Sequence, residues 1–160
     1  MTPANSRQGA DFDHGEFAVS SEFKEVFRMS MPIRWGDMDA FGHVNNTVYF
    51  RYMEQVRISW LETLNIASEE SATGEGPVIV NANMTFLRQL RYPGDIDCRM
   101  FIGTPGRSSV DTRFELRRAD TPEILVAEGG AKIVWVNYKA EKSVPLPEVV
   151  RTLFAAQSSK

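Results

Sequence analysis

Two acids, a histidine and two asparagines lie between Asp37 and Asn46, directly before the only long helical pattern in the sequence. Asp39 and His43 are side chains that can move a proton, and a carboxylate can also attack a carbonyl carbon. The first turn of a helix carries unpaired backbone N–H groups, which stabilise negative charge on a nearby oxygen. Together, these residues suit acyl chemistry, in which a carbonyl oxygen becomes negatively charged.

The helix after this turn is predicted over residues 47–64. Its apolar residues recur every three or four positions, at Tyr49, Met53, Val56, Trp60 and Leu64. This spacing predicts an amphipathic helix of about five turns. Asn45 or Asn46 can cap its start, because an asparagine side-chain oxygen accepts hydrogen bonds from first-turn amides.

Strand-like patterns occur on both sides of this helix. Apolar residues alternate before it, over residues 27–35, which is the period of a half-buried strand. Four more such segments follow the helix, at residues 78–90, 96–102, 110–116 and 124–136. Gly129 and Gly130 in the last segment predict a bulge or a sharp coil of the strand, and Pro147 predicts the start of a short helix.

The order of these elements predicts an α+β fold. Strands joined by short turns pair antiparallel, and the helix must bury its apolar stripe against the sheet. We therefore expect a curved antiparallel sheet of about five strands wrapped round one long central helix. Residues 1–21 are polar and without periodicity, so we predict a disordered leader followed by a single domain over residues 22–156.

Composition excludes several classes of protein. The net charge is −3 and the basic residues are dispersed, which does not fit a nucleic-acid-binding surface. Cys98 is the sole cysteine and the chain has two histidines, so we predict no disulfide and no metal site. No segment has the pattern of a secretory signal or a membrane span. We expect a cytoplasmic protein.

A family resemblance is carried by the strand, the turn D-x-D-x-x-G-H-V-N-N, the helix with Y-M-E-Q-V-R, and the later segment F-L-R-Q-L-R-Y-P-G-D. This order resembles the hot-dog fold thioesterases of the 4-hydroxybenzoyl-CoA thioesterase type, over about residues 24–150. The resemblance implies that Asp39, three residues before Gly42, is the catalytic acid. It also implies that a backbone N–H near Asn46 polarises the thioester carbonyl. Related proteins join sheets edge to edge, which implies a homodimer or homotetramer with sites near both subunits.

Thioester hydrolysis can be carried out by few groups. Asp39 could act as a nucleophile or as a general base, and both routes remain open. A thiol has a pKa of about 8.5, so it departs as a thiolate without a proton donor. We expect no cofactor, because coenzyme A would be part of the substrate. His43 is a third catalytic candidate, and Asp37 ranks below Asp39. The predicted substrate-binding residues are Gly42, Asn45 and Tyr49.

Other interpretations of the same residues stay open. Asp39 and His43 could form the pair of a hydratase or dehydratase on the same fold. The chain could instead bind acyl-CoA without catalysis, with Asp39 only closing the turn. The sequence does not decide between coenzyme A and an acyl carrier protein as the thiol carrier. Arg88, Arg91 and Arg107 could meet phosphate groups, or could be solvated charges at strand ends.

Overall fold

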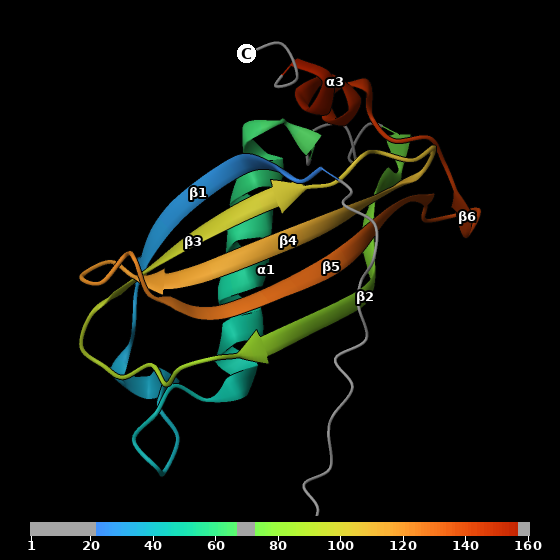
Figure 1. The fold of residues 1–160 in the computed structure, drawn as a ribbon. Coiled ribbons are helices and arrows are strands. Elements are labelled where there is room, and N and C mark those ends of the chain that lie inside the picture. The colour runs from blue at the N-terminus through green and yellow to red at the C-terminus, as the bar shows by residue number, and fades with distance from the viewer. Residues whose placement is uncertain (1–21, 67–72, 157–160) are drawn as a thin grey trace, which may run out of the picture.

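The computed structural model describes residues 22–66 and 73–156 of the chain (Figure 1). The predicted disordered leader, residues 1–21, lies outside this part. The elements are, in order, β1 (Lys24–Pro32), the 3-10 turn η1 (Trp35–Asp37), α1 (Asn46–Thr63), β2 (Glu75–Phe86), β3 (Asp95–Ile102), β4 (Ser109–Arg118), β5 (Leu125–Asn137), β6 (Lys142–Ser143) and α3 (Glu148–Ala156).

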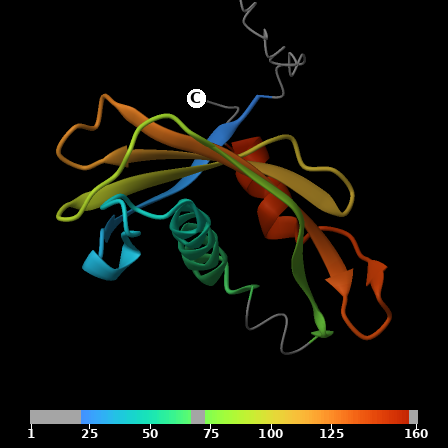
Figure 2. The same ribbon diagram turned by 90° about the horizontal axis from the view of Figure 1, so that it is seen from below.

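The strands form one antiparallel sheet in the order β1-β3-β4-β5-β2, and the two-residue β6 pairs with β5. The sheet curves round α1, which lies against its concave face (Figures 1 and 2). This arrangement confirms the predicted α+β hot-dog fold. The predicted central helix is present over 18 residues, which is five turns.

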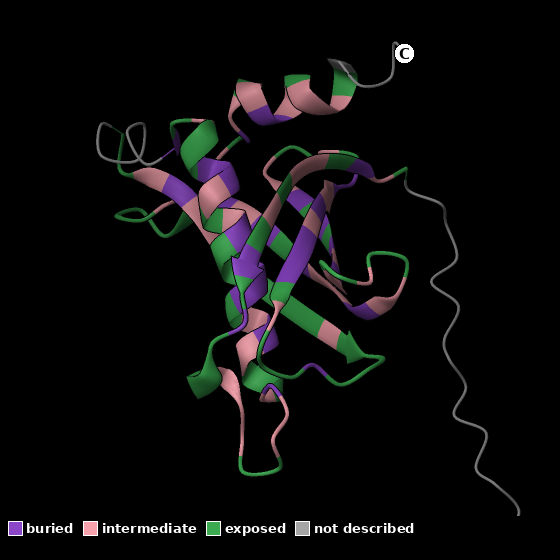
Figure 3. Cartoon of the chain, turned by 90° about the vertical axis from the view of Figure 1, so that its left-hand side faces the viewer, coloured by how far each residue is buried: buried purple, intermediate pink, exposed green. Residues whose placement is uncertain are grey.

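The core lies between α1 and the sheet. One face of the helix is buried, through Tyr49, Met53, Val56 and Trp60, and Figure 3 shows this buried stripe running along α1. Buried residues of the inner strands, such as Phe114, face the same core. The spacing of three and four residues keeps these side chains on one side of the helix. That side packs against the sheet.

Two local predictions were wrong. Trp35, expected to continue the first strand, begins η1 and is 74% exposed. Gly129 and Gly130 do not mark a bulge, since β5 runs past them in register with both neighbouring strands. A Cβ atom on Gly129 would lie 2.5 Å from the carbonyl oxygen of Asn83. The glycine is therefore explained by the close approach of β2.

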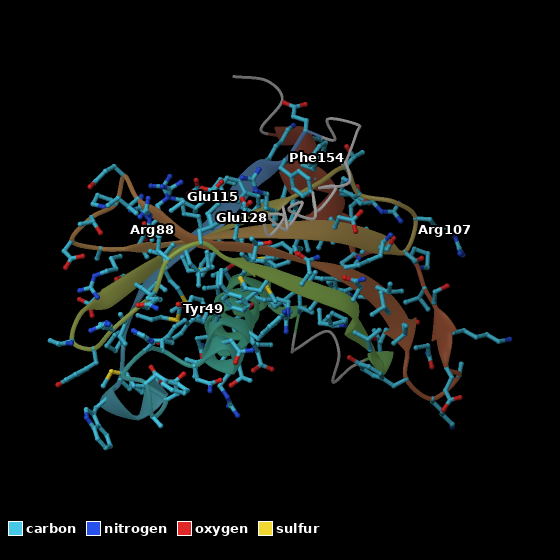
Figure 4. The ribbon with its side chains drawn as sticks, turned by 60° about the horizontal axis from the view of Figure 1, so that its bottom comes forward. Tyr49, Arg88, Arg107, Glu115, Glu128 and Phe154 are labelled. Atoms are coloured by element: carbon cyan, nitrogen blue, oxygen red, sulfur yellow. The ribbon has the colours of Figure 1, made fainter. Side chains whose placement is uncertain are left out.

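The convex face of the sheet carries alternating charges. Arg28 pairs with the buried Asp97 at 2.7 Å, and Arg113 pairs with Glu115 at 2.7 Å. Figure 4 shows Glu115 and Glu128 on the side of the sheet away from α1. This face therefore interacts with water, as one face of an antiparallel sheet commonly does.

The last helix, α3, closes one end of the sheet. Its Val150 is fully buried, and the ammonium group of Lys24 donates a 2.6 Å hydrogen bond to the carbonyl oxygen of Phe154. The same ammonium lies 4.2 Å from the centre of the Phe154 ring. The helix predicted to begin near Pro147 is thus present and is attached to the first strand. Neither described helix has the length and apolar character needed to cross a membrane.

Candidate active site

The turn that carries Asp39 is a tight loop closed by backbone hydrogen bonds. Met38 and Val44 form an isolated antiparallel bridge, and the Asp39 amide donates to the carbonyl of His43 at 2.8 Å. Gly42 has a φ of +75° and donates to the carbonyl of Asp39 at 3.0 Å. Only glycine adopts this φ without strain. Gly42 therefore shapes the turn from its backbone.

The carboxylate of Asp39 is partly engaged within the turn. Its Oδ1 accepts a 2.8 Å hydrogen bond from the amide of Phe41. Nothing in the described part of the chain donates to Oδ2. One oxygen thus fixes the orientation of the side chain, and the other is available for a substrate or a water molecule.

The start of α1 leaves one amide unused. Asn45 is the N-cap, and its Oδ1 accepts hydrogen bonds from the amide and hydroxyl of Thr47 at 2.9 and 2.7 Å. The Val48 amide donates to the Asn45 carbonyl at 2.9 Å. The amide of Asn46 has no acceptor among the described residues. Asn45 therefore accepts hydrogen bonds from the amides of Thr47 and Val48, and the Asn46 N–H stays free to meet a ligand.

A cavity of about 310 Å³ joins these groups. It is lined by Asp39, His43, Val44, Asn46, Tyr49, Phe86, Leu87, Arg88 and Gln89. Four predicted site residues, Asp39, His43, Asn46 and Tyr49, therefore meet in one place. Gly42 and Asn45 lie next to cavity residues in the sequence, but they do not line the cavity. Their described contacts shape the turn and cap the helix.

Tyr49 forms the inner wall of this cavity. It is 3% exposed and packs edge to face on Phe86, with ring centres 5.0 Å apart. Burial raises the pKa of its hydroxyl, and a hydrogen bond from the backbone of Leu90 partly offsets that rise. Tyr49 is therefore neutral at physiological pH and can only donate or accept a hydrogen bond.

The second acid of the turn faces elsewhere. Oδ2 of Asp37 accepts hydrogen bonds from the hydroxyl of Tyr52 and the amide of Arg34, both at 2.8 Å. Asp37 is absent from the lining of the Asp39 cavity. Its lower rank in the sequence analysis agrees with this placement.

The end of β2 and the segment after it supply a wall of the cavity, and of its residues the sequence singled out only Arg88. Phe86, Leu87 and Arg88 line the cavity, and the guanidinium of Arg91 contacts Nε2 of His43 at 2.8 Å. These residues belong to the F-L-R-Q-L-R-Y-P-G-D segment, so the family resemblance was the available signal. Arg107 lies far from Arg88, toward the opposite end of the sheet (Figure 4).

No group of three histidine, cysteine, aspartate or glutamate side chains within residues 22–66 and 73–156 is arranged to hold a metal ion. The groups available for chemistry in this cavity are thus a carboxylate, an imidazole, a phenol and a helix amide.

Comparison with known families identifies the superfamily of this chain. The model of the thioesterase-like superfamily matches residues 33–154, which include the whole site. The chain belongs to the thioesterase-like superfamily. Within this superfamily, it is 33% identical over 136 residues to the acyl-acyl carrier protein thioesterase ATL3 of Arabidopsis thaliana chloroplasts, covering 84% of this chain and 68% of ATL3. It spans 63–68% of the length of the curated relatives that it matches.

Solved structures of other proteins share the fold. The PA2801 protein of Pseudomonas aeruginosa, provisionally described as a thioesterase, is 36% identical with a TM-score of 0.78, over 82% of this chain and 99% of that one. The 1,4-dihydroxy-2-naphthoyl-CoA thioesterase of Synechocystis has a TM-score of 0.75 at 17% identity, over 84% and 98% of the two chains, and supports the fold alone. On the superfamily and the named relatives, this chain is a thioester hydrolase.

Proposed function

We propose that the protein hydrolyses acyl thioesters at the cavity beneath the end of β2, with Asp39 as the catalytic carboxylate. One observation carries the proposal: a carboxylate with a free oxygen and a helix-start amide without an acceptor line the same cavity. The amide of Asn46 would hold the carbonyl oxygen as it becomes negatively charged. The partial positive charge of the α1 N-terminus adds to that stabilisation.

Two routes fit this arrangement. In the first, Oδ2 of Asp39 attacks the thioester carbon, the thiolate leaves, and water then hydrolyses the mixed anhydride. In the second, Asp39 accepts a proton from a water molecule that attacks the carbon directly. Both consume one water and give a free acid and a thiol. The leaving thiolate is stable enough to depart unassisted, so the proposed reaction uses no metal or redox cofactor.

The substrate is proposed to be an acyl group carried on coenzyme A or on an acyl carrier protein. Relatives and structural neighbours include enzymes named for each carrier. The lining supports an apolar acyl group, because Tyr49, Phe86 and Leu87 are among its residues. Arg88 lies on the same lining and supplies a positive charge.

The proposal is tested by thiol release from acyl-CoA and acyl carrier protein thioesters of several chain lengths. Asp39→Asn should lower turnover about a hundredfold or more, the scale of losing a catalytic acid or base. Asp111→Asn is the matched control, since that aspartate is exposed on β4 and pairs only with Lys132, at 3.7 Å. Equal turnover in the Asp39→Asn variant and wild type would reduce Asp39 to a turn residue.

We propose a homodimer formed through β2, with further pairing into a tetramer as the alternative assembly. β2 is an edge strand, and it exposes Ile79, Val80 and Phe86 by 37%, 58% and 45%. An edge strand with apolar side chains favours pairing with another strand. Pairing there would place the partner beside the cavity, because Phe86 belongs to both the strand and the lining.

Light scattering at working concentration tests this assembly. Val80→Lys places a charge on the pairing edge and should shift the protein to a monomer with reduced activity. Ser30→Lys makes the same change on β1, at the other edge of the sheet, and should leave the assembly intact. A monomeric wild-type protein with full activity would remove the shared-edge proposal.

We also propose a cytoplasmic location. The described cysteine, Cys98, is a free and buried thiol, and burial raises the pKa of that thiol. A free thiol is compatible with a reducing compartment. Cell fractionation followed by immunoblotting tests the location, and recovery from a membrane or secreted fraction would contradict it.

A further inference from the structure

The contact between Arg91 and His43 indicates which ring nitrogen of the histidine carries the proton. A guanidinium nitrogen of Arg91 lies 2.8 Å from Nε2 of His43. Arginine has five N–H donors and no acceptor. For this contact to be a hydrogen bond, Nε2 must accept it with its lone pair. The ring proton of His43 is then on Nδ1.

The loop that carries Arg91 is held by a backbone hydrogen bond on each side, one to the turn that carries His43 and one to the residue after β1. The amide of Val44, the residue after His43, donates to the carbonyl of Leu90 at 2.9 Å. The amide of Ile33, the residue after β1, donates to the carbonyl of Gly94 at 2.8 Å. The backbone on either side of Arg91 therefore has a fixed position relative to His43.

Arg118 holds the same loop from the sheet side. Its guanidinium donates to the carbonyls of Arg91 and Pro93 at 2.9 and 3.0 Å, and to both carboxylate oxygens of Asp120 at 2.9 Å. A Cβ atom on Gly94 would lie 2.3 Å from this guanidinium. A side chain at Gly94 would therefore force the Arg118 guanidinium to move.

We propose that Arg91 is a positioning residue, held in place by Arg118, that orients the His43 ring so that Nε2 accepts its hydrogen bond and the ring proton lies on Nδ1. His43 then acts in the cavity as a hydrogen-bond donor. This inference rests on the proposed thioester hydrolysis and assigns separate roles to Asp39 and His43. Proton acceptance falls to Asp39, and the imidazole donates to a polar atom of the substrate or to water.

The arrangement has a consequence for the kind of reaction. A histidine that removes a proton from a substrate carbon needs a nitrogen lone pair free to accept that proton. In His43, the contact with Arg91 occupies the lone pair of Nε2, and Nδ1 already carries a proton. The histidine chemistry of a dehydratase is therefore blocked while Arg91 stays in place.

The primary test reads the tautomer directly and does not depend on turnover. The chain contains two histidines, so proton–nitrogen correlation spectra of ¹⁵N-histidine-labelled protein give two ring patterns, assigned with a His43→Gln variant. At about pH 8.5 an ordinary imidazole is neutral. We expect His43 to be protonated on Nδ1 in wild type and to lose this preference in Arg91→Gln. Protonation on Nε2 in wild type, or an unchanged tautomer in Arg91→Gln, would overturn the inference.

Kinetics with matched variants then separate positioning from general disturbance. Arg91→Gln should lower kcat about tenfold with a smaller change in KM, as expected when one polar group is misoriented. Arg91→Lys keeps a donor and should recover part of that loss. Arg118→Gln should shift the His43 tautomer in the same direction, while Arg113→Gln, on the convex face of the sheet, should change neither readout. Arg91→Gln with wild-type kcat would overturn the positioning role.

The outcomes distinguish failure of this inference from failure of the proposed function. If Asp39→Asn is fully active while the tautomer responds to Arg91→Gln, hydrolysis at Asp39 is wrong and the positioning contact is right. If Asp39→Asn is inactive while the tautomer ignores Arg91→Gln, the positioning role alone is wrong.

Discussion

The hydroxyl of Tyr52 donates a 2.8 Å hydrogen bond to Oδ2 of Asp37, linking the second turn of α1 to the loop that carries Asp39. Backbone contacts extend this link. The Asp37 carbonyl accepts from the amide of Asn45 at 2.9 Å, and its carboxylate accepts from the amide of Arg34. Asp37 thus connects the segment after β1, the helix cap and the helix body through its carbonyl and its carboxylate.

Removal of the Tyr52 hydroxyl should loosen this connection. We expect Tyr52→Phe to lower the free energy of unfolding by about 1–2 kcal/mol, because the half-buried Asp37 loses one hydrogen bond. Urea denaturation measures the change. Tyr92→Phe, at a tyrosine that is 46% exposed, is the control and should stay within about 0.5 kcal/mol of wild type. Equal effects of the two substitutions would contradict the linking role.

Stability should also fall at alkaline pH. Burial and the hydrogen bond to Asp37 raise the pKa of Tyr52. Above about pH 10 the unfolded chain releases the tyrosine proton that the folded chain retains, so the free energy of unfolding decreases as pH rises. We expect the melting temperature of wild type to fall more steeply between about pH 9 and 11 than that of Tyr52→Phe. Parallel curves would show that Tyr52 does not contribute to this decline.

Gly129 should tolerate no side chain. Gly129→Ala would place a Cβ atom 2.5 Å from the carbonyl oxygen of Asn83, so β2 must move away from β5. We expect a loss of about 1–3 kcal/mol of stability, the range for overpacking. Gly36→Ala is the matched control, since nothing lies within 4 Å of a Cβ atom there. Thermal denaturation of both variants provides the comparison, and similar melting temperatures would refute the close-approach explanation.

The helix cap should matter for both stability and turnover. Asn45→Ala removes the acceptor of the Thr47 amide and should cost about 1 kcal/mol. The freed first turn would also hold the Asn46 amide less firmly, so turnover should fall with it. Asn45→Asp keeps an acceptor and should restore most of the stability. Circular dichroism melts and thiol-release assays measure the two effects.

Much of this architecture could be predicted from the sequence. The change from a two-residue period to a three-and-four-residue period at Thr47 placed α1 within one residue of its observed start at Asn46, because the burial of one helix face produces that period. The turn before it was identified from its acids, glycine and asparagines. Asp39, His43, Asn46 and Tyr49 then meet in one cavity, as local chain geometry requires.

The parts that were missed depend on contacts distant in sequence. The contact between Arg91 and His43 spans 48 positions, and the contact between Arg118 and Arg91 spans 27. Neither contact produces a periodic pattern in the sequence. Gly129 is ambiguous for the same reason, since a glycine in a strand permits either a bulge or a close neighbour, and only the pairing with β2 decides between them.

The attachment of Lys24 to the carbonyl of Phe154 has a consequence for synthesis. The two residues are 130 positions apart, so the first strand emerges from the ribosome long before its last contact exists. β1 pairs with β3 and not with β2, the next strand in the sequence. Early in translation, β1 therefore has no strand to pair with. The contact between Lys24 and Phe154 can therefore form only after α3 has left the ribosome.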